Sequence, residues 1–171
     1  MSEVVYRAGE PGDALAIAAQ GKAAFLEAFQ HVYDAQEIAG YFATTYGPGV
    51  QDQELGDPEN QLFLVEDEGG LLGHLKLGRC TLPKTNGEPS AEIKRFYVLA
   101  RAQGTGVARA LLMQAVEAAQ AQAARGLYLS CWKGNDRAVR FYQREGFVIV
   151  GEQHFPVGTR IDEDYVMRRP I

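Results

Sequence analysis

The stretch FYVLARAQGTGVARALL, residues 96–112, decides how this sequence is understood. An apolar run is followed by two glycines that lie two residues apart, Gly104 and Gly106, and then by apolar residues at helical spacing. A strand, a glycine turn and a helix in this order present free backbone N–H groups where the helix dipole also favours negative charge. The stretch therefore predicts a site for a phosphorylated ligand.

Apolar patterns on both sides of this stretch predict one α/β domain over residues 1–171. Polar segments rich in glycine and proline, 47–60 and 83–90, predict loops. We found no repeat and no domain boundary in the sequence. Helices are predicted over 11–29, 34–46, 104–124 and 135–146, and strands over 3–9, 91–100, 126–132, 147–155 and 160–171, with a hairpin over 61–78.

Composition narrows the class of protein. The N-terminus does not resemble a signal peptide, and no apolar stretch approaches membrane-spanning length, so we expect a cytoplasmic protein without a membrane partner. Two cysteines, Cys80 and Cys131, do not suggest a disulfide framework. Three scattered histidines, His31, His74 and His154, lack metal-ligand spacing, so no metal is expected.

Charge is distributed unevenly along the chain, whose net charge is −5. Residues 1–70 hold 13 acidic residues and two basic ones, whereas residues 71–171 hold nine acidic and 15 basic residues. A nucleic-acid-binding protein is typically basic throughout, so nucleic acid is not an expected partner. The acidic half either attracts a cationic substrate or forms a solvated surface.

Two familiar phosphate-binding designs do not match the glycine turn. A Walker loop requires a Gly-Lys-Ser/Thr tripeptide, which this sequence lacks. A Rossmann fingerprint requires a small residue where Arg109 stands and an acidic residue near the end of the next strand, where Cys131 and Trp132 stand. A nucleotide-binding oxidoreductase is therefore disfavoured.

A third design matches. The spacing Arg101-x-x-Gly104-x-Gly106-x-Ala108 resembles the acetyl-CoA-binding motif of the GNAT superfamily of N-acetyltransferases. The segment NDRAVRFYQREGF, residues 135–147, resembles the closing motif of the same family. The opening and ending of the chain resemble the branch that contains bacterial polyamine N-acetyltransferases. The resemblance spans the order of elements, although only residues 91–147 carry specific motifs.

The resemblance implies a fold and a cosubstrate. The fold is a mixed, largely antiparallel central sheet of about six to seven strands, with about four helices and two parallel central strands that splay apart. Those strands correspond to 91–99 and 127–131. Acetyl-CoA would place its pantetheine arm in the gap, against the backbones of Phe96 and Val98, and its phosphates at the turn. The N–H groups that would hold the phosphates belong to Gln103, Gly104, Thr105, Gly106, Val107 and Ala108.

The resemblance implies roles for particular residues of this sequence, and several of these residues also have an alternative role. Tyr142 is expected to be the general acid that protonates the leaving thiolate, or else an aromatic packing residue. Asn135 bonds the pantetheine, caps its helix, or does both. Glu92 is either a base or a solvent-facing strand residue. Arg101 and Arg144 are candidates for the 3′-phosphate of CoA.

The predicted reaction moves the acetyl group of acetyl-CoA to a primary amine by direct attack in a ternary complex. A covalent route through Cys131 is disfavoured, because no histidine lies nearby in sequence to activate it. The acidic first half makes a polyamine or another cationic small molecule the first expected acceptor. Peptide N-termini and amino sugars remain open, and so does a non-catalytic acyl-CoA sensor on the same fold. The hairpin edge at the end of the chain suggests a possible homodimer.

Overall fold

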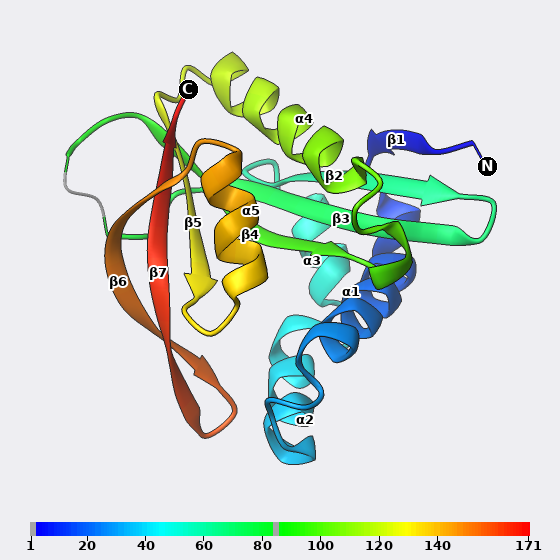
Figure 1. The fold of residues 1–171 in the computed structure, drawn as a ribbon. Coiled ribbons are helices and arrows are strands. Elements are labelled where there is room, and N and C mark those ends of the chain that lie inside the picture. The colour runs from blue at the N-terminus through cyan, green and yellow to red at the C-terminus, as the bar shows by residue number, and fades with distance from the viewer. Residues whose placement is uncertain (1–2, 84–85) are drawn as a thin grey trace.

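The computed structural model describes residues 3–83 and 86–171, so Lys84 and Thr85 of the predicted loop over 83–90 lie outside the described residues. One seven-stranded sheet has the order β1-β2-β3-β4-β5-β7-β6 (Figure 1). The strands are β1 (Val5–Ala8), β2 (Gln61–Asp67), β3 (Gly70–Arg79), β4 (Ser90–Val98), β5 (Gly126–Trp132), β6 (Val148–Val157) and β7 (Arg160–Pro170). The α-helices are α1 (Ala14–Phe29), α2 (Ala35–Thr45), α3 (Val50–Gly56), α4 (Val107–Ala121) and α5 (Asp136–Arg144). The predicted mixed α/β fold is confirmed.

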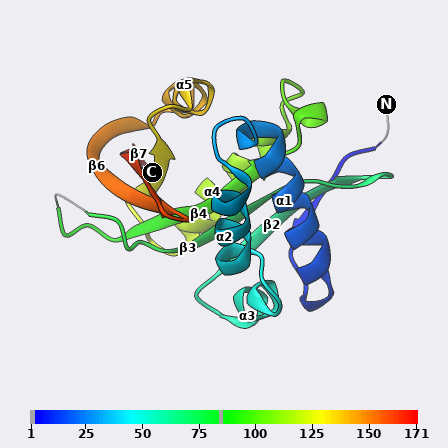
Figure 2. The same cartoon turned by 90° about the horizontal axis from the view of Figure 1, so that it is seen from below.

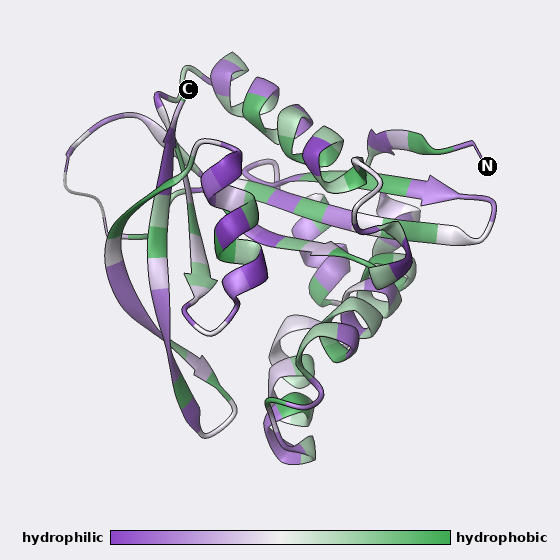
Figure 3. Ribbon diagram, viewed as in Figure 1, coloured by the Kyte–Doolittle hydropathy of each residue, from purple (hydrophilic) through white to green (hydrophobic). Residues whose placement is uncertain are grey.

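Helices cover both faces of the sheet (Figures 1 and 2). The α4/α5 face carries the main apolar core, in which Leu111 and Leu112 of α4 are fully buried together with Leu127 of β5. The opposite face is covered by α1, α2 and α3, and we call it the α1–α3 face. Helix α5 is mostly hydrophilic in Figure 3, and Val139 is its single buried residue. This helix therefore lies over the sheet with most of its surface in solvent.

The two central strands form a fork, as predicted. Strands β4 and β5 are the one parallel pair among the described residues, and they pair only from Ser90↔Gly126 to Ile93↔Leu129. At that point Lys76 of β3 pairs with Arg95 and Leu77 with Ile93, so that Lys94 is an extra, bulged residue of β4. A β-bulge bends its strand. The bulge thus turns β4 away from β5 at the position where their pairing ends.

Helix α3 corrects the prediction of a loop over 47–60. Gly49 precedes the helix in the left-handed region, with φ +79°, and Leu55 packs against the small core of Ile17, Leu62 and Leu64. Gln51 is buried and donates a hydrogen bond to the carbonyl of Thr45 at 2.7 Å. Tertiary packing therefore makes a helix from a segment whose glycines and prolines indicate turns.

Strand β6 ends the sheet at one edge and pairs only with β7 among the described strands. It exposes apolar side chains, including Val148, Ile149 and Phe155. The homodimer through this edge stays a prediction. No helix formed by residues 3–83 and 86–171 combines the length and the apolarity needed to cross a membrane.

Candidate active site

The glycine turn before α4 leaves backbone N–H groups free. Gly104 and Gly106 have φ values of +79° and +90°, where a side chain is strained, and a Cβ on either would meet nothing within 4 Å. Neither the backbone nor any side chain of the described residues accepts a hydrogen bond from the N–H groups of residues 104–109. An anion can therefore approach these donors at the positive end of the helix dipole.

Gln103 corrects the predicted set of donors. Its N–H donates to the carbonyl of Ala100 at 3.1 Å, so it is not available to a ligand. Its side chain instead donates to the carbonyl of Val98 at 3.0 Å, and Thr105 Oγ1 donates to the carbonyl of Ala102 at 2.6 Å. Both side chains hold the turn in shape. The candidate phosphate site begins at Gly104 and extends to Arg109, one residue beyond the predicted range.

Strand β4 presents free backbone groups to the fork. The N–H of Leu99 donates to the carbonyl of Leu72 at 2.8 Å, and Val98 pairs with Gly73 of β3. Antiparallel partners alternate between hydrogen-bonded and non-hydrogen-bonded pairs, so the backbone groups of Val98 and Phe96 point away from β3. They point to the side on which β5 has departed. An extended ligand can therefore pair with β4 in place of a strand.

Tyr142 reaches the fork from α5. Its ring lies 6.4 Å from that of Phe96 and 5.6 Å from that of Phe147. Its hydroxyl has no hydrogen-bond partner among the described residues. Burial raises the pKa of Tyr142 far above its ordinary value of 10.0, with a smaller contribution from Cys131. The hydroxyl therefore keeps its proton at neutral pH and can offer it to a group in the fork.

Cys131 lies beside Tyr142 but is not prepared to act as a nucleophile. Burial raises the pKa of its thiol to about 12, with a smaller contribution from the charge of Asp164. A buried thiol of this kind is protonated at neutral pH and unreactive.

In residues 3–83 and 86–171, no three His, Cys, Asp or Glu side chains are placed to hold a metal ion.

Asn135 and Glu92 both have structural partners. The Asn135 side chain accepts a hydrogen bond from the N–H of Ala138 at 3.2 Å and so caps α5. Glu92 lies on the closed part of β4, where its Oε2 accepts from the N–H of Thr81 and from Lys94 Nζ, both at 2.8 Å. It therefore points neither to solvent nor into the open part of the fork. This placement does not support its selection as the base.

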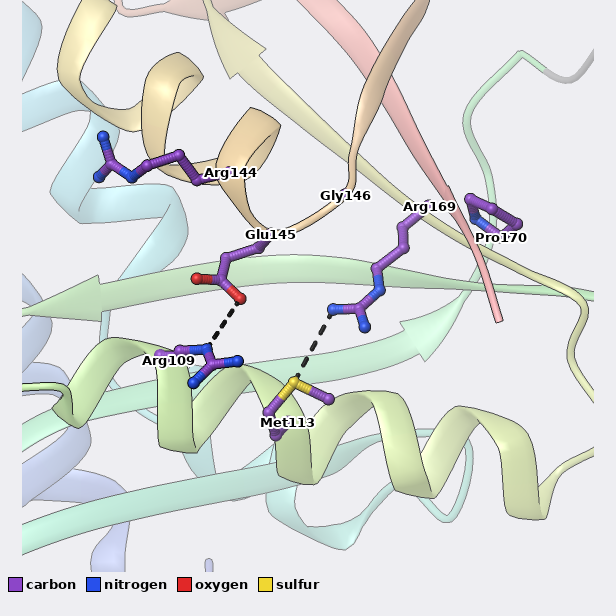
Figure 4. Close-up of a pocket in the computed structure, with 7 residues that line it drawn as sticks. All are labelled: Arg109, Met113, Arg144, Glu145, Gly146, Arg169 and Pro170. Atoms are coloured by element: carbon purple, nitrogen blue, oxygen red, sulfur yellow. Dashed lines mark hydrogen bonds and ion pairs between the residues drawn. The ribbon is translucent and has the colours of Figure 1, made fainter.

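The structure separates the two arginines predicted for the 3′-phosphate. Arg101 donates twice to Asp67 in the β2–β3 turn, at 2.6 and 3.2 Å. Arg144 lines a shallow pocket of about 370 Å³ between α4, α5 and the end of β7. In Figure 4, Arg109 and Arg169 extend into this pocket, whereas Arg144 extends away from them. The sequence prediction omitted Arg109, although its place directly after the glycine turn was a signal that could have found it.

The α1–α3 face carries a buried polar cluster next to β4, which we call the β4 cluster. Its members are Gln20, Glu54, His74, Lys76 and Arg95. Arg95 Nε can only donate, so His74 Nε2 accepts (2.9 Å) and the proton on His74 Nδ1 donates to Gln20 Oε1 (2.5 Å). Burial lowers the pKa of His74 well below 6.5, and the charges of Arg95 and Lys76 lower it further. His74 is therefore neutral.

Several residues of the acidic first half have structural roles. Glu54 accepts from Arg95 and Lys76, Asp34 and Glu37 cap α2 reciprocally, and Glu27 accepts from the N–H of Ala100 at 2.7 Å. The acidic surface is therefore less available to a cationic substrate than the composition suggests.

Two acidic residues on β7, Asp162 and Asp164, were not predicted from the sequence and are only 4% and 6% exposed. They alternate with the exposed Ile161 and Glu163 and share the parity of the buried Val166. Because side chains on a strand alternate between its two faces, both acids lie on the face of Val166. Met167 on the opposite face is also buried, so the alternation in the sequence gives no signal that would have found them.

Comparisons with known proteins agree with this architecture. The sequence model of the acetyltransferase (GNAT) family matches residues 24–147. An uncharacterised N-acetyltransferase of Mycobacterium tuberculosis is 28% identical over 136 residues, which cover 80% of this chain and 83% of the relative.

Solved structures share the fold at low sequence identity. The PaiA N-acetyltransferase of Thermoplasma acidophilum, in complex with coenzyme A, has a TM-score of 0.79 at 14% identity and covers 99% of both chains. A spermidine N-acetyltransferase chimera from Vibrio cholerae and hSSAT has a TM-score of 0.69 at 24% identity, covering 99% of this chain and 96% of that one. The family match spans most of the sequence, and the fork, the glycine turn and the closing helix lie within it. This chain belongs to the GNAT family of acetyltransferases.

Proposed function

We propose that this protein transfers the acetyl group of acetyl-CoA to a primary amine by direct attack in a ternary complex. One observation carries the proposal: the free N–H groups of residues 104–109 lie along one path with the free N–H groups of Phe96 and Val98 and the carbonyl of Phe96. A diphosphate suits the first group of donors, and a pantetheine amide suits the second. Coenzyme A carries both. A solved relative of the same fold contains coenzyme A.

The chain's own residues account for the chemistry. Acetyl-CoA supplies an activated acyl group as a thioester. The N–H of Val98 is free to donate to the carbonyl oxygen of that group, which stabilises the negative charge that develops on attack. Tyr142 keeps its proton at neutral pH and donates it to the departing sulfur. The exposed Arg144 and Arg109, at the pocket between α4 and α5, are the candidates for the 3′-phosphate, although Arg109 Nε pairs with Glu145 at 3.3 Å.

Polyamines are the first acceptors to test, because a spermidine N-acetyltransferase is among the proteins of similar fold. The solved neighbours also include enzymes named for a ribosomal-protein alanine and for nourseothricin. Peptide N-termini and amino compounds other than polyamines therefore belong in the same panel.

Binding of acetyl-CoA is tested with two glycine variants. Gly106→Ala places a Cβ at the phosphate donors, so we expect at least ~10-fold weaker binding in a thermal-shift titration, or about 1.4 kcal/mol. Gly49→Ala is the matched control: its φ is also positive, its Cβ would also meet open space, and it also precedes a helix. Both variants should lose about 1–2 kcal/mol of stability from backbone strain. Equal affinity for acetyl-CoA in the two variants would place the phosphates elsewhere.

Catalysis is tested with Tyr142→Phe. We expect kcat to fall ~100-fold while the KM for acetyl-CoA changes little, because the hydroxyl acts on the leaving group. Thiol release with the amine panel measures both constants. Tyr165→Phe is the control, since this partly buried tyrosine packs against the same core. Wild-type protein that binds acetyl-CoA and acetylates no amine would be a sensor instead.

A further inference from the structure

We propose that Asp164 binds the ammonium group of the acceptor amine and takes its proton, an assignment that rests on the proposed function. The family resemblance made Glu92 a candidate base, but the structure puts it on the closed part of β4. Asp164 comes from the other half of the sheet. Its position along the fork, its free oxygen and its surroundings each support the assignment.

Asp164 lies beside the open part of the fork. It pairs with Trp132, the last residue of β5. The last parallel pair is Ile93↔Leu129. Trp132 lies three positions further along β5. Tyr97 lies three positions further along β4 when the bulged residue Lys94 is not counted. Asp164 is therefore level with Tyr97, between the two β4 residues whose backbone groups face the fork.

One oxygen of Asp164 is engaged and the other is free. Ser130 is the first β5 residue beyond the pairing with β4. Its hydroxyl accepts from Gln153 Nε2 at 3.0 Å and donates to Asp164 Oδ2 at 2.5 Å. No described residue donates to Asp164 Oδ1, and no described cation pairs with this carboxylate. Ser130 thus fixes the orientation of a buried carboxylate that keeps one oxygen for a ligand.

Asp162, two residues earlier on β7, shows the opposite arrangement. It accepts from the hydroxyl of Tyr33 and forms an ion pair with Arg160 at 2.8 Å. Its charge is therefore neutralised within the protein. The two acids lie on one face of one strand, and of these two described carboxylates only Asp164 lacks a cation.

Aromatic rings connect the two prongs of the fork on the α1–α3 face. The ring of Phe25 lies 6.4 Å from that of Tyr97 on β4, and the ring of Phe29 lies 6.1 Å from that of Trp132 on β5. Tyr33 lies 6.3 Å from Trp132. Aromatic faces attract cations and accommodate apolar chains. The surroundings of Asp164 therefore suit a primary ammonium group on an apolar or aromatic body.

The environment also makes Asp164 a stronger base than an ordinary carboxylate. Burial raises its pKa, the hydrogen bond from Ser130 opposes that shift, and the negative charge of Asp162 raises it further. Tyr33 and the Cys131 thiol also interact with its charge, and Arg160 is paired with the neighbouring Asp162. A carboxylate with a raised pKa accepts a proton more readily near neutral pH.

The groups already named account for every proton that moves in the acetyl transfer. The ammonium nitrogen gives one proton to Asp164 Oδ1, and the released lone pair forms the nitrogen–carbon bond while the carbon–sulfur bond breaks. Tyr142 supplies a proton to the sulfur and is restored by the second proton that the nitrogen loses. Asp164 passes its proton to water. The products are the N-acetyl amine, the thiol and one proton.

The test compares Asp164→Asn with Glu163→Gln. Glu163 is the neighbouring acid on the opposite face of β7, and its side chain is 66% exposed. With benzylamine and spermidine as probes, we expect kcat/KM for the amine to fall ~100-fold in Asp164→Asn at neutral pH. The deficit should shrink as the pH approaches the pKa of the amine, because the amine then arrives without its extra proton. Glu163→Gln should behave as wild type.

Calorimetry gives a second readout that does not need turnover. Benzylamine is titrated into each variant saturated with CoA, and we expect at least ~10-fold weaker amine binding in Asp164→Asn with unchanged affinity for CoA. A pH-independent deficit together with unchanged amine affinity would make Asp164 a structural residue and overturn the inference. Failure of the wild type to bind acetyl-CoA at all would instead refute the proposed function.

Discussion

Two buried polar clusters flank the fork, and they differ in what their members leave free. The β4 cluster is closed: Glu54 accepts from Arg95 at 2.6 and 3.1 Å and from Lys76 at 2.8 Å. The second cluster, which we call the β7 cluster, consists of Ser130, Gln153, Asp162 and Asp164 with Tyr33 and Arg160. It contains a carboxylate that no cation of the described residues neutralises. We infer that a buried charge whose polar atoms are all paired has a structural role, whereas a buried charge that keeps a free polar atom is a candidate for binding or catalysis.

The closed cluster should carry the larger energetic effect. Burial opposes ionisation of Glu54, but Arg95 and Lys76 outweigh it and leave the pKa of Glu54 below 4.5. Arg95 is 8% exposed, and its guanidinium lies 5.2 Å from the centre of the Tyr46 ring. Loss of the carboxylate would leave a buried guanidinium without its counter-charge. Such an uncompensated charge is strongly destabilising.

We therefore expect Glu54→Ala to lower the free energy of unfolding by about 3–5 kcal/mol. Urea denaturation measures the loss, and Gln53→Ala, an exposed position of the same helix, is the control. A loss below about 1 kcal/mol would show that solvent reaches Arg95 and that the β4 cluster is not closed. The comparison between the two clusters would then fail.

Much of the fold was predictable because local signals agreed with tertiary packing. The strand over 126–132 and the helix that follows the glycine turn were predicted within a few residues. The fork was predictable only through the family resemblance. Its physical cause, the bulge at Lys94, depends on the register between β3 and β4, which no local pattern records.

The candidate site was less predictable, because its residues find partners far away in sequence. Arg101 lies beside the glycines but is engaged by Asp67, which is 34 residues distant. The backbone N–H of Gln103 is not available to a ligand, because it donates to the carbonyl of Ala100 at the end of a single 3₁₀ turn, Ala100–Ala102. The glycine spacing does not reveal this turn. Motif spacing predicts where a site lies, whereas hydrogen-bond competition decides which of its groups are free.

The free carboxylate gives the smaller effect, and with the opposite sign. The folded state raises the pKa of Asp164 above 3.8, so folding disfavours its ionised form and the free energy of unfolding falls as the pH rises from about 3.8 through the raised value. Asp164→Asn removes this cost and can still accept from Ser130. Relative to wild type, we expect equal stability in acid and a gain at neutral pH that is smaller than the loss in Glu54→Ala. Urea denaturation between about pH 4 and pH 7 measures the difference, with Glu163→Gln as the control. A neutral-pH loss of stability would mean that Asp164, like Glu54, holds a cation in the folded protein, and the distinction between the clusters would be wrong.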